Sequence, residues 1–223
     1  NDQELGSMVR NLLSLKTRER EVDDLNKLLT ENVLKRYLRY RGFDVFHVLN
    51  ITAVEDKILR RLREEGGSLA ELTGEYTKRF LSELSLLNVI DADVYPRATE
   101  HVAEMIELIC VLMDKGVAYE RQGSVYFSIK KFPDYGKFAR LDMAGMQDGI
   151  SVDTDEYEKE GARDFALWKA WSEDDGEIYW DSPFGIGRPG WHIECSAMSM
   201  KYLGRTFDIH TGGVDLIFPH HQN

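Results

Sequence analysis

The sequence predicts an α/β protein on three grounds. Apolar residues recur at helical spacing in several stretches, short β-branched and aromatic runs follow them, and two such runs flank a glycine-containing turn. At 223 residues, with 43% hydrophobic and 30% charged residues, the chain is long and apolar enough to bury a large core.

The first half predicts helices joined by a strand. An apolar stripe over residues 33–38 predicts a helix that ends at Gly42, and residues 43–49 then predict a buried strand. Ser68 and Glu71 have the spacing of a capping box, in which each side chain satisfies a free N–H of the first helical turn. A second helix is therefore expected from this point.

Residues 99–163 change from helix to hairpin. Thr99 is predicted to cap a helix that stops before Gly116. Residues 117–120 and 125–129 then predict a β-hairpin. Residues 137–163, rich in glycine and acidic residues, predict a mobile loop, after which ordered structure resumes at residue 164.

Charge and cysteine content restrict the function classes. The net charge of −11 argues against a broad nucleic-acid surface, and the densest basic stretch, residues 35–41, is better explained as the solvated face of a helix. Cys110 and Cys195 lie far apart, which indicates neither a disulfide framework nor a zinc finger and fits a reducing cytoplasm. No apolar run is long enough to span a bilayer, so we expect no membrane partner.

The N-terminus carries no secretory signal, because neither a basic region nor an apolar one follows residue 1. Residues 5–8 are typical of a cloning scar before a natural start at Met8. We therefore leave residues 1–7 out of the fold prediction.

Two clusters near the C-terminus carry side chains with chemical potential. Trp191, His192 and Cys195 follow a Pro-Gly turn; a cysteine in such a place is also often a small buried hydrophobe. The second cluster, residues 210–215, sets glycines before an acid able to bind sugar hydroxyls. His220 and Cys195 together supply nitrogen and sulfur donors of the kind that zinc prefers.

These motifs resemble cysteinyl-tRNA synthetases. The strongest matches to the zinc and adenylate region of that family are residues 187–198, 207–210 and 212–221. Further upstream and central segments also resemble it, so that the match is nearly continuous from residue 33 to residue 223; they are residues 38–42, 50–52, 56–58, 96–101 and 164–169.

The resemblance implies a class I synthetase fold: a doubly wound parallel sheet with an inserted α+β connective subdomain. On this basis residues 8–93 form the first half of the nucleotide-binding catalytic domain, in shortened form. Residues 94–163 form the inserted subdomain, and residues 164–223 form the second half with the zinc and cysteine site.

The same resemblance implies a ligase that activates cysteine with ATP and Mg²⁺ and transfers it to tRNA. Cys195 and His220 match two of four ligands of a zinc ion that binds the substrate thiolate. Thr52, Trp191 and His210 match residues around the bound cysteine. Gly213 and Asp215 match the ribose-binding turn. Cysteine, ATP and tRNA are the implied partners of a cytoplasmic and monomeric parent enzyme.

The chain also departs from the family pattern. The first zinc cysteine and the His-Ile-Gly-His signature belong between the opening strand, which residues 12–21 resemble, and the first helix, but residues 23–32 are too few to hold them. The fourth zinc ligand, a glutamate, the Lys-Met-Ser-Lys-Ser loop and the anticodon-reading domain would follow Asn223. No catalytic residue is therefore assigned, and we expect the chain alone to be inactive.

Three other interpretations stay open at this point. A related ligase joins cysteine to an amino sugar in mycothiol synthesis and differs only in its acceptor. The chain also fits a non-catalytic remnant that binds a nucleotide, cysteine or a partner without turnover. Lastly, a genuine deletion and the omission of stretches of a longer protein leave the same sequence, and the intact mass would separate the two.

Overall fold

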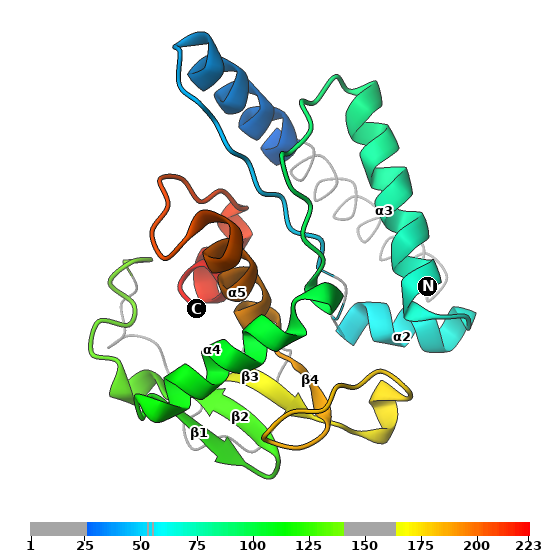
Figure 1. Ribbon diagram of the computed structural model, residues 1–223, viewed down its shortest axis with the longest axis vertical. Coiled ribbons are helices and arrows are strands. Elements are labelled where there is room, and N and C mark those ends of the chain that lie inside the picture. Colours follow the sequence, from blue (N-terminus) through cyan, green and yellow to red (C-terminus); the bar gives the residue numbers. More distant parts are fainter. Residues whose placement is uncertain (1–25, 53, 55, 141–163) are drawn as a thin grey trace, which may run out of the picture.

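The structure is a computed structural model that describes residues 26–52, 54, 56–140 and 164–223. A helix over residues 26–40 comes first. The labelled helices and strands in Figure 1 are, in chain order, α2 (Asp56–Glu65), α3 (Leu69–Leu86), α4 (Val102–Asp114), β1 (Ala118–Arg121), β2 (Ser124–Phe127), β3 (Phe165–Ala170), β4 (Gly187–Pro189) and α5 (Trp191–Leu203). Short helical turns η1 to η5 cover Ala98–Glu100, Ile129–Lys131, Glu173–Asp175, Val214–Leu216 and Ile217–His221.

The strands form one antiparallel sheet in the order β1-β2-β3-β4. The helices α4 and α5 pack on each other and against this sheet (Figure 1). Their inward side chains build the hydrophobic core, in which Met105, Ile109 and Trp168 are fully buried. Ile193, Ala197 and Met198 of α5 belong to the same core, which therefore fixes one face of this helix.

The predicted hairpin is confirmed. β1 pairs with β2, from Ala118 opposite Phe127 to Arg121 opposite Ser124. The two turn residues Gln122 and Gly123 both have positive φ, 52° and 78°, which is the conformation of the two-residue turns that match strand twist.

The sheet that the structure shows is not the doubly wound parallel one. In the described residues, parallel pairing is limited to the bridges Val48 with Val94 and Ile51 with Arg97. The prediction of a buried strand over residues 43–49 is wrong, because among these residues Val48 alone pairs, in an isolated bridge, and Phe43 and Phe46 are 62% and 56% exposed. A strand needs a continuous ladder of hydrogen bonds to a partner. Residues 93–97 are the partner here, and their backbone hydrogen bonds begin only at His47.

The helix ends show what local sequence determines. The capping box is confirmed, with Glu71 N donating to Ser68 Oγ at 3.2 Å and Ser68 N donating to Glu71 Oε2 at 3.1 Å. The prediction of a Thr99 cap is wrong, because Thr99 lies inside η1 and α4 is preceded by His101. The His101 ring is held by the Arg97 carbonyl at 2.7 Å and the Tyr202 hydroxyl at 2.9 Å, which fixes the chain there.

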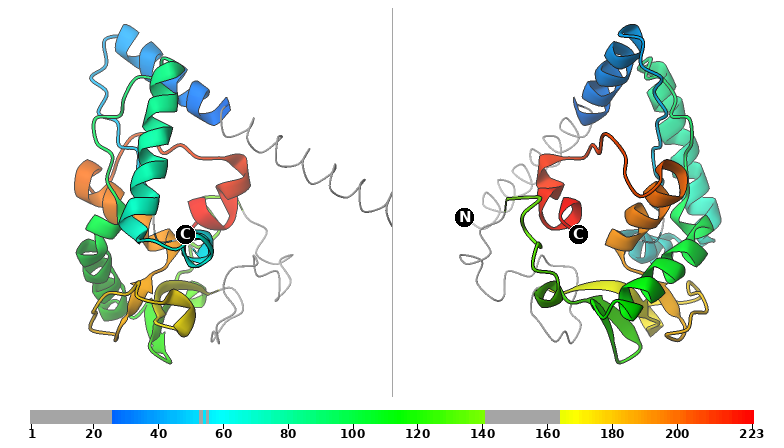
Figure 2. Two further views of the ribbon diagram at one scale, coloured as in Figure 1. Left: turned by 90° about the vertical axis from the view of Figure 1, so that its right-hand side faces the viewer. Right: turned by 60° about the vertical axis from the view of Figure 1, so that its left-hand side comes forward.

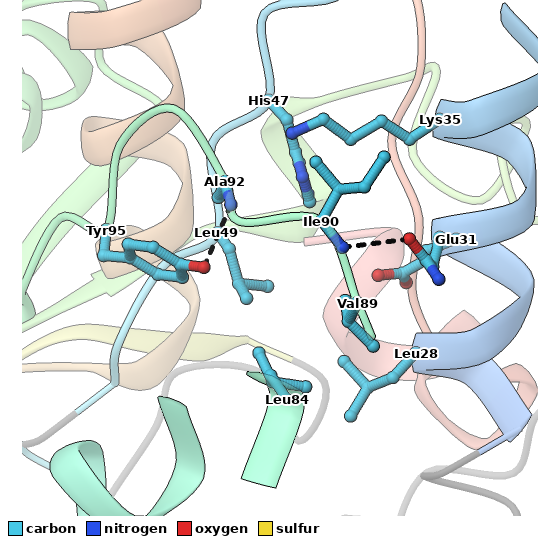
Figure 3. A pocket seen from close by; sticks show the side chains of 11 residues that line it. Leu28, Glu31, Lys35, His47, Leu49, Leu84, Val89, Ile90, Ala92 and Tyr95 are labelled. Carbon is cyan, nitrogen blue, oxygen red and sulfur yellow. Dashed lines mark hydrogen bonds between the residues drawn. The ribbon is translucent and has the colours of Figure 1, made fainter. Parts of the chain in front are cut away.

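The helix over residues 26–40, predicted from its apolar stripe, docks on the extended segments that follow it and ends at Gly42, whose φ is +86°. Figure 3 shows Lys35 reaching from this helix toward His47. The Lys35 Nζ donates to the Asp91 carbonyl at 2.6 Å, and Ile90 N donates to Asn32 Oδ1 at 3.1 Å. These polar contacts fasten the helix to residues 88–93.

The chain after α5 runs back along the molecule and brings η5 to the first turn of α5 (Figure 2). Among the described residues, no helix has both the length and the apolarity needed to cross a bilayer. The strand-like residues 12–21 and residues 141–163 of the predicted loop lie outside the described residues.

Candidate active site

The first turn of α5 is fixed by a glycine. Gly190 N donates to the Leu167 carbonyl at 2.9 Å, and a Cβ at Gly190 would lie 2.1 Å from the Ala166 carbonyl oxygen. Only glycine allows the backbone to approach β3 this closely. Trp191, the next residue, is thereby held at the end of β3 and β4.

Three rings meet at this point. The imidazole of His220 stacks on the indole of Trp191 with centroids 4.1 Å apart and an interplanar angle of 16°. The Nδ1 atoms of His192 and His220 are 2.9 Å apart. One proton must lie between these nitrogens, so one ring donates and the other accepts. His192 also meets the edge of Phe165 at 5.4 Å.

A second glycine brings the C-terminal histidines close to the preceding loop. A Cβ at Gly212 would lie 2.1 Å from His221 Nε2, so a side chain at this position is excluded without movement. His210 is exposed, and its ring lies 5.3 Å from that of His221. His210 is therefore joined to the ring cluster through His221.

Cys195 lies one helical turn after His192 on α5. Its Sγ accepts a hydrogen bond from Asn50 Nδ2 at 3.4 Å, which links α5 to the segment between the bridges at Val48 and Ile51. Burial, together with the nearby Glu194 carboxylate, raises the pKa of the Cys195 thiol to about 12. The thiol is thus protonated at neutral pH.

Thr52 lies two residues after Asn50, and both line a cavity of ≈ 440 Å³ between this segment, α2 and α3. Arg61, which lies over the Tyr76 ring at 4.7 Å, and the hydroxyl of Thr73 add polar groups to its mostly apolar wall. Ligand cavities in proteins commonly have volumes of about 300–1,000 Å³, so the space suits a small molecule.

The predicted ribose-binding residues lie between α5 and η5. Gly213 is buried, and its carbonyl accepts from Leu216 N at 3.0 Å at the start of η4. Asp215 lies in η4, and the placement of its side chain is outside the described part of the structure. The role of both residues stays a prediction.

The sequence as a whole decides the family. A family model for the catalytic domain of class I (C) tRNA synthetases matches residues 22–223. The chain belongs to this family. Its relatives named cysteine–tRNA ligase include proteins from Brachyspira hyodysenteriae, 50% identical over 204 residues, and from Koribacter versatilis, 49% identical over 203 residues. A third, from Thermodesulfovibrio yellowstonii, is 52% identical over 196 residues.

These alignments cover 91%, 91% and 86% of this chain but only 43%, 41% and 40% of the respective relatives. The class I synthetase chain thus spans about two fifths of the length of the curated relatives it matches. What the relatives' names say of their activity therefore enters below as a proposal.

The zinc ion that the family implies does not fit the described residues by themselves. Among these residues, no three His, Cys, Asp or Glu side chains are arranged to hold a metal ion. The donor chemistry of the two predicted ligands is suitable nonetheless. Burial, with His221 and His210 nearby, lowers the pKa of His220 to about 4, so its ring is neutral at neutral pH, as a metal ligand must be.

A second cavity beside His47 carries no comparable chemistry. It has a volume of ≈ 10 Å³, about the space of one water molecule, and its wall is formed mainly by apolar residues such as Leu49 and Leu84 (Figure 3). No substrate of this class I synthetase family fits there. The larger cavity beside Thr52 is therefore the candidate site for a small-molecule ligand.

Two further residues belong to this site, His192 and Asn50, and the sequence pattern assigns no role to either. His192 stands within the motif that carries the resemblance, and its spacing of three from Cys195 would have put both on one helix face. Asn50 directly precedes the matched Ile51 and Thr52, but nothing in the sequence shows that its side chain meets Cys195, 145 positions away.

Proposed function

We propose that the protein to which this chain belongs is a cysteine–tRNA ligase. The observation that carries the proposal is the meeting of Trp191, His192 and His220 at the start of α5, with Cys195 one turn further and joined to Asn50, in a chain that matches the family from residue 22 to residue 223. The cysteine carboxylate attacks the α-phosphate of ATP, pyrophosphate leaves, and a tRNA hydroxyl then takes the aminoacyl group as AMP leaves.

The roles of the site residues follow from this proposal. Trp191 and Thr52 border the bound cysteine, and His210 approaches it through the loop that Gly212 brings to His221. Gly213 and Asp215 hold the ribose of ATP. Their contribution is mainly positioning, because the reaction needs the carboxylate and the α-phosphate in line.

Cys195 and His220 are proposed as two of four zinc ligands in the whole enzyme. Held by these residues in the whole enzyme, zinc would supply a Lewis acid that favours the thiolate form of the substrate and so cysteine over serine. The neutral ring of His220 supports this role. His192 supports it as well, because its ring contacts His220 and it lies one helical turn before Cys195 on α5. The Cys195 thiol must lose its proton on binding zinc, so affinity should rise with pH.

The finer fold predictions also belong to this proposal. The parallel bridges at Val48 and Ile51 support a doubly wound parallel sheet in the whole catalytic domain. The division into residues 8–93, 94–163 and 164–223 stays a proposal, and the β2–β3 ladder crosses its second boundary. A monomeric enzyme of the cytoplasm is proposed on the family resemblance.

We propose further that the chain alone activates cysteine poorly. Residues 23–32 hold no histidine or glycine that could admit and bind a phosphate. Removing one electrostatic contact to the reacting group commonly costs about a hundredfold to a thousandfold in rate. This same observation supports the second candidate, a binding remnant without turnover. A cysteine–amino-sugar ligase would share the site, and the acceptor used by an active form separates it from a tRNA ligase.

Binding of radiolabelled cysteine to the purified chain with Zn²⁺, measured by equilibrium dialysis, tests the site. We expect cysteine to bind weakly and excess serine to compete, because a zinc ion with two of its four protein ligands binds loosely and discriminates the two amino acids poorly. Trp191→Ala should weaken binding by about tenfold, since a stacked aromatic contact contributes about 0.5–1.5 kcal/mol beyond its buried area. Trp171→Ala, which removes a 38% exposed tryptophan away from the site, is the matched control. The absence of cysteine binding by the parent protein would overturn the proposal.

A further inference from the structure

Four charged side chains outside the ring cluster form a connected ion-pair network. The Nζ of Lys169 on β3 lies 3.1 Å from Asp56 Oδ2 at the start of α2, and Arg188 on β4 bonds the other Asp56 oxygen. The Nε of Arg188 also donates to Asp175 Oδ1 at 2.7 Å. The network therefore joins α2 to β3, β4 and η3.

Most of this network is shielded from solvent. The side chains of Lys169, Arg188 and Asp175 are only 7%, 6% and 3% exposed, and that of Asp56 is 41% exposed. Burial alone would raise the pKa of Asp56, but the neighbouring Lys169 and Arg188 outweigh it and hold the pKa below its usual value. Asp56 is therefore ionised at neutral pH, and its pairs are screened less than pairs on the surface.

The network and the candidate site join the same two parts of the chain, namely the segment around Thr52 and the segment from β4 into α5. Asp56 follows Thr52 by four residues, and Arg188 precedes Trp191 by three. The second link between these segments is the hydrogen bond from Asn50 to Cys195. The segment that contains Thr52 is thus tied to β4 and α5 at both of its ends.

Between these ties, the segment is held by backbone and core contacts. Ile51 N donates to the Pro96 carbonyl at 2.8 Å, and Val54 is 2% exposed in the hydrophobic core. Val54 shares this core with Ile193 and Ala197 of α5, so apolar packing also links the segment to that helix. The ion pairs of Asp56 add polar links from this segment to β3 and β4, and the hydrogen bond from Asn50 adds one to Cys195 on α5.

We propose that Asp56 is a positioning residue: its ion pairs with Lys169 and Arg188 hold Asn50 and Thr52 against the start of α5, so that Asn50 stays on Cys195. That this arrangement serves cysteine recognition rests on the proposed function. The contact between Asn50 and Cys195 belongs to the structure itself, so the two claims are tested separately.

The matched variants separate charge from packing. Asp56→Asn keeps the size of the side chain and removes its charge, whereas Asp56→Glu keeps the charge. Asp174→Asn is the control, because the pair of Arg63 and Asp174 also joins α2 to η3 but is 47% and 83% exposed. Exposed pairs of this kind contribute little.

The rate of Cys195 alkylation at one fixed pH, in a Cys110→Ser background, reports whether Asn50 still covers the thiol. We expect Asp56→Asn to increase the rate by about fivefold, within the range of couplings between residues that share contacts. Asn50→Ala should give the same increase, and the double variant should be no faster than Asn50→Ala. Asp56→Glu and Asp174→Asn should react like the parent protein.

A parental rate in Asp56→Asn would overturn the proposal, and so would increases that multiply in the double variant, since these indicate general loosening. If Asp56→Asn fails to give the parental far-UV spectrum, Lys169→Met takes its place, because it removes one cation and keeps a long apolar stem. A parental rate in that variant would be equally decisive against the proposal.

Cysteine binding by the same proteins separates this proposal from the proposed function. Weaker binding by Asp56→Asn, with parental binding by Asp174→Asn, is the expected result. Should the parent protein bind no cysteine, the proposed function fails, while the alkylation rates still decide whether Asp56 positions the segment. Unchanged cysteine affinity in Asp56→Asn would overturn the link between positioning and recognition.

Discussion

The ring of His220 lies on the ring of Trp191 at a centroid distance of 4.1 Å and shares a 2.9 Å contact with His192. This contact joins η5, at Ile217–His221, to the first turn of α5, although the rest of α5 and the loop after it separate the two in the sequence. It also partly buries an imidazole, and burial is the largest cause of the lowered pKa of His220.

The first prediction concerns acid stability. The folded protein holds the pKa of His220 near 4, below its ordinary value of 6.5, so the unfolded chain binds more protons between these values. The neutral His220 ring therefore contributes to the unfolding free energy above pH 6.5, and this contribution is lost as the pH falls toward 4. We expect the unfolding free energy to fall by about 1–2 kcal/mol across this window, after allowing for partial screening of the ring by solvent.

Urea unfolding of the metal-free protein at a series of pH values measures this contribution. His220→Gln is the control, because it removes the titrating group and keeps a polar side chain. The difference in unfolding free energy between the two proteins should shrink as the pH falls from 6.5 to 4. A difference that stays constant across this window would contradict the prediction.

The second prediction concerns Gly212. An added Cβ would lie 2.1 Å from His221 Nε2, so Gly212→Ala must displace the ring or the loop and should lower the unfolding free energy by about 1–3 kcal/mol. Gly74→Ala in α3 is the matched control, with no atom within 4 Å of the new Cβ. It should stabilise the helix by about 0.5–1 kcal/mol. Equal effects of the two substitutions would show that the close approach at Gly212 does not exist.

The third prediction concerns the capping box of α3. Ser68→Ala removes the acceptor of the Glu71 N–H and should cost about 1 kcal/mol of unfolding free energy. Ser82→Ala, within the same helix, removes only an exposed bond to the Arg79 carbonyl and should be close to neutral. Thermal unfolding followed by circular dichroism compares the two, and a Ser68→Ala midpoint equal to that of Ser82→Ala would refute the assignment.

Features set by neighbouring residues could be predicted from the sequence. The capping box of Ser68 and Glu71 and the hairpin around Gly123 depend on a few adjacent positions, and both were predicted correctly, although the strands continue to Arg121 and Ser124. The Thr99 cap failed because the His101 ring, held by the hydroxyl of Tyr202 far along the chain, sets where α4 begins.

Features that depend on distant pairing could not be predicted in the same way. Residues 43–46 have strand-like composition, but a strand forms only where a partner continues the ladder. The motif pattern and the family resemblance singled out Trp191, Cys195 and His220, yet the contact of His220 with His192 depends on how the chain returns after α5. Asn50 and Asp56 were missed for the same reason.

We propose that this chain carries the cysteine site of a tRNA ligase without the segment that binds the phosphates during activation. Grafting the missing segment and the C-terminal remainder of the Brachyspira hyodysenteriae relative onto the chain gives the matched active form. Transfer of cysteine from this chimera to tRNA, rather than to an amino sugar, identifies the acceptor.

Cysteine-dependent exchange of pyrophosphate into ATP, measured side by side for the chain and the chimera, tests the claim most directly. The account predicts that the chain is at least about a hundredfold slower than the chimera, and that Trp191→Ala abolishes exchange by the chimera. Exchange by the chain alone at the rate of a full-length relative, abolished by Trp191→Ala, would contradict the account.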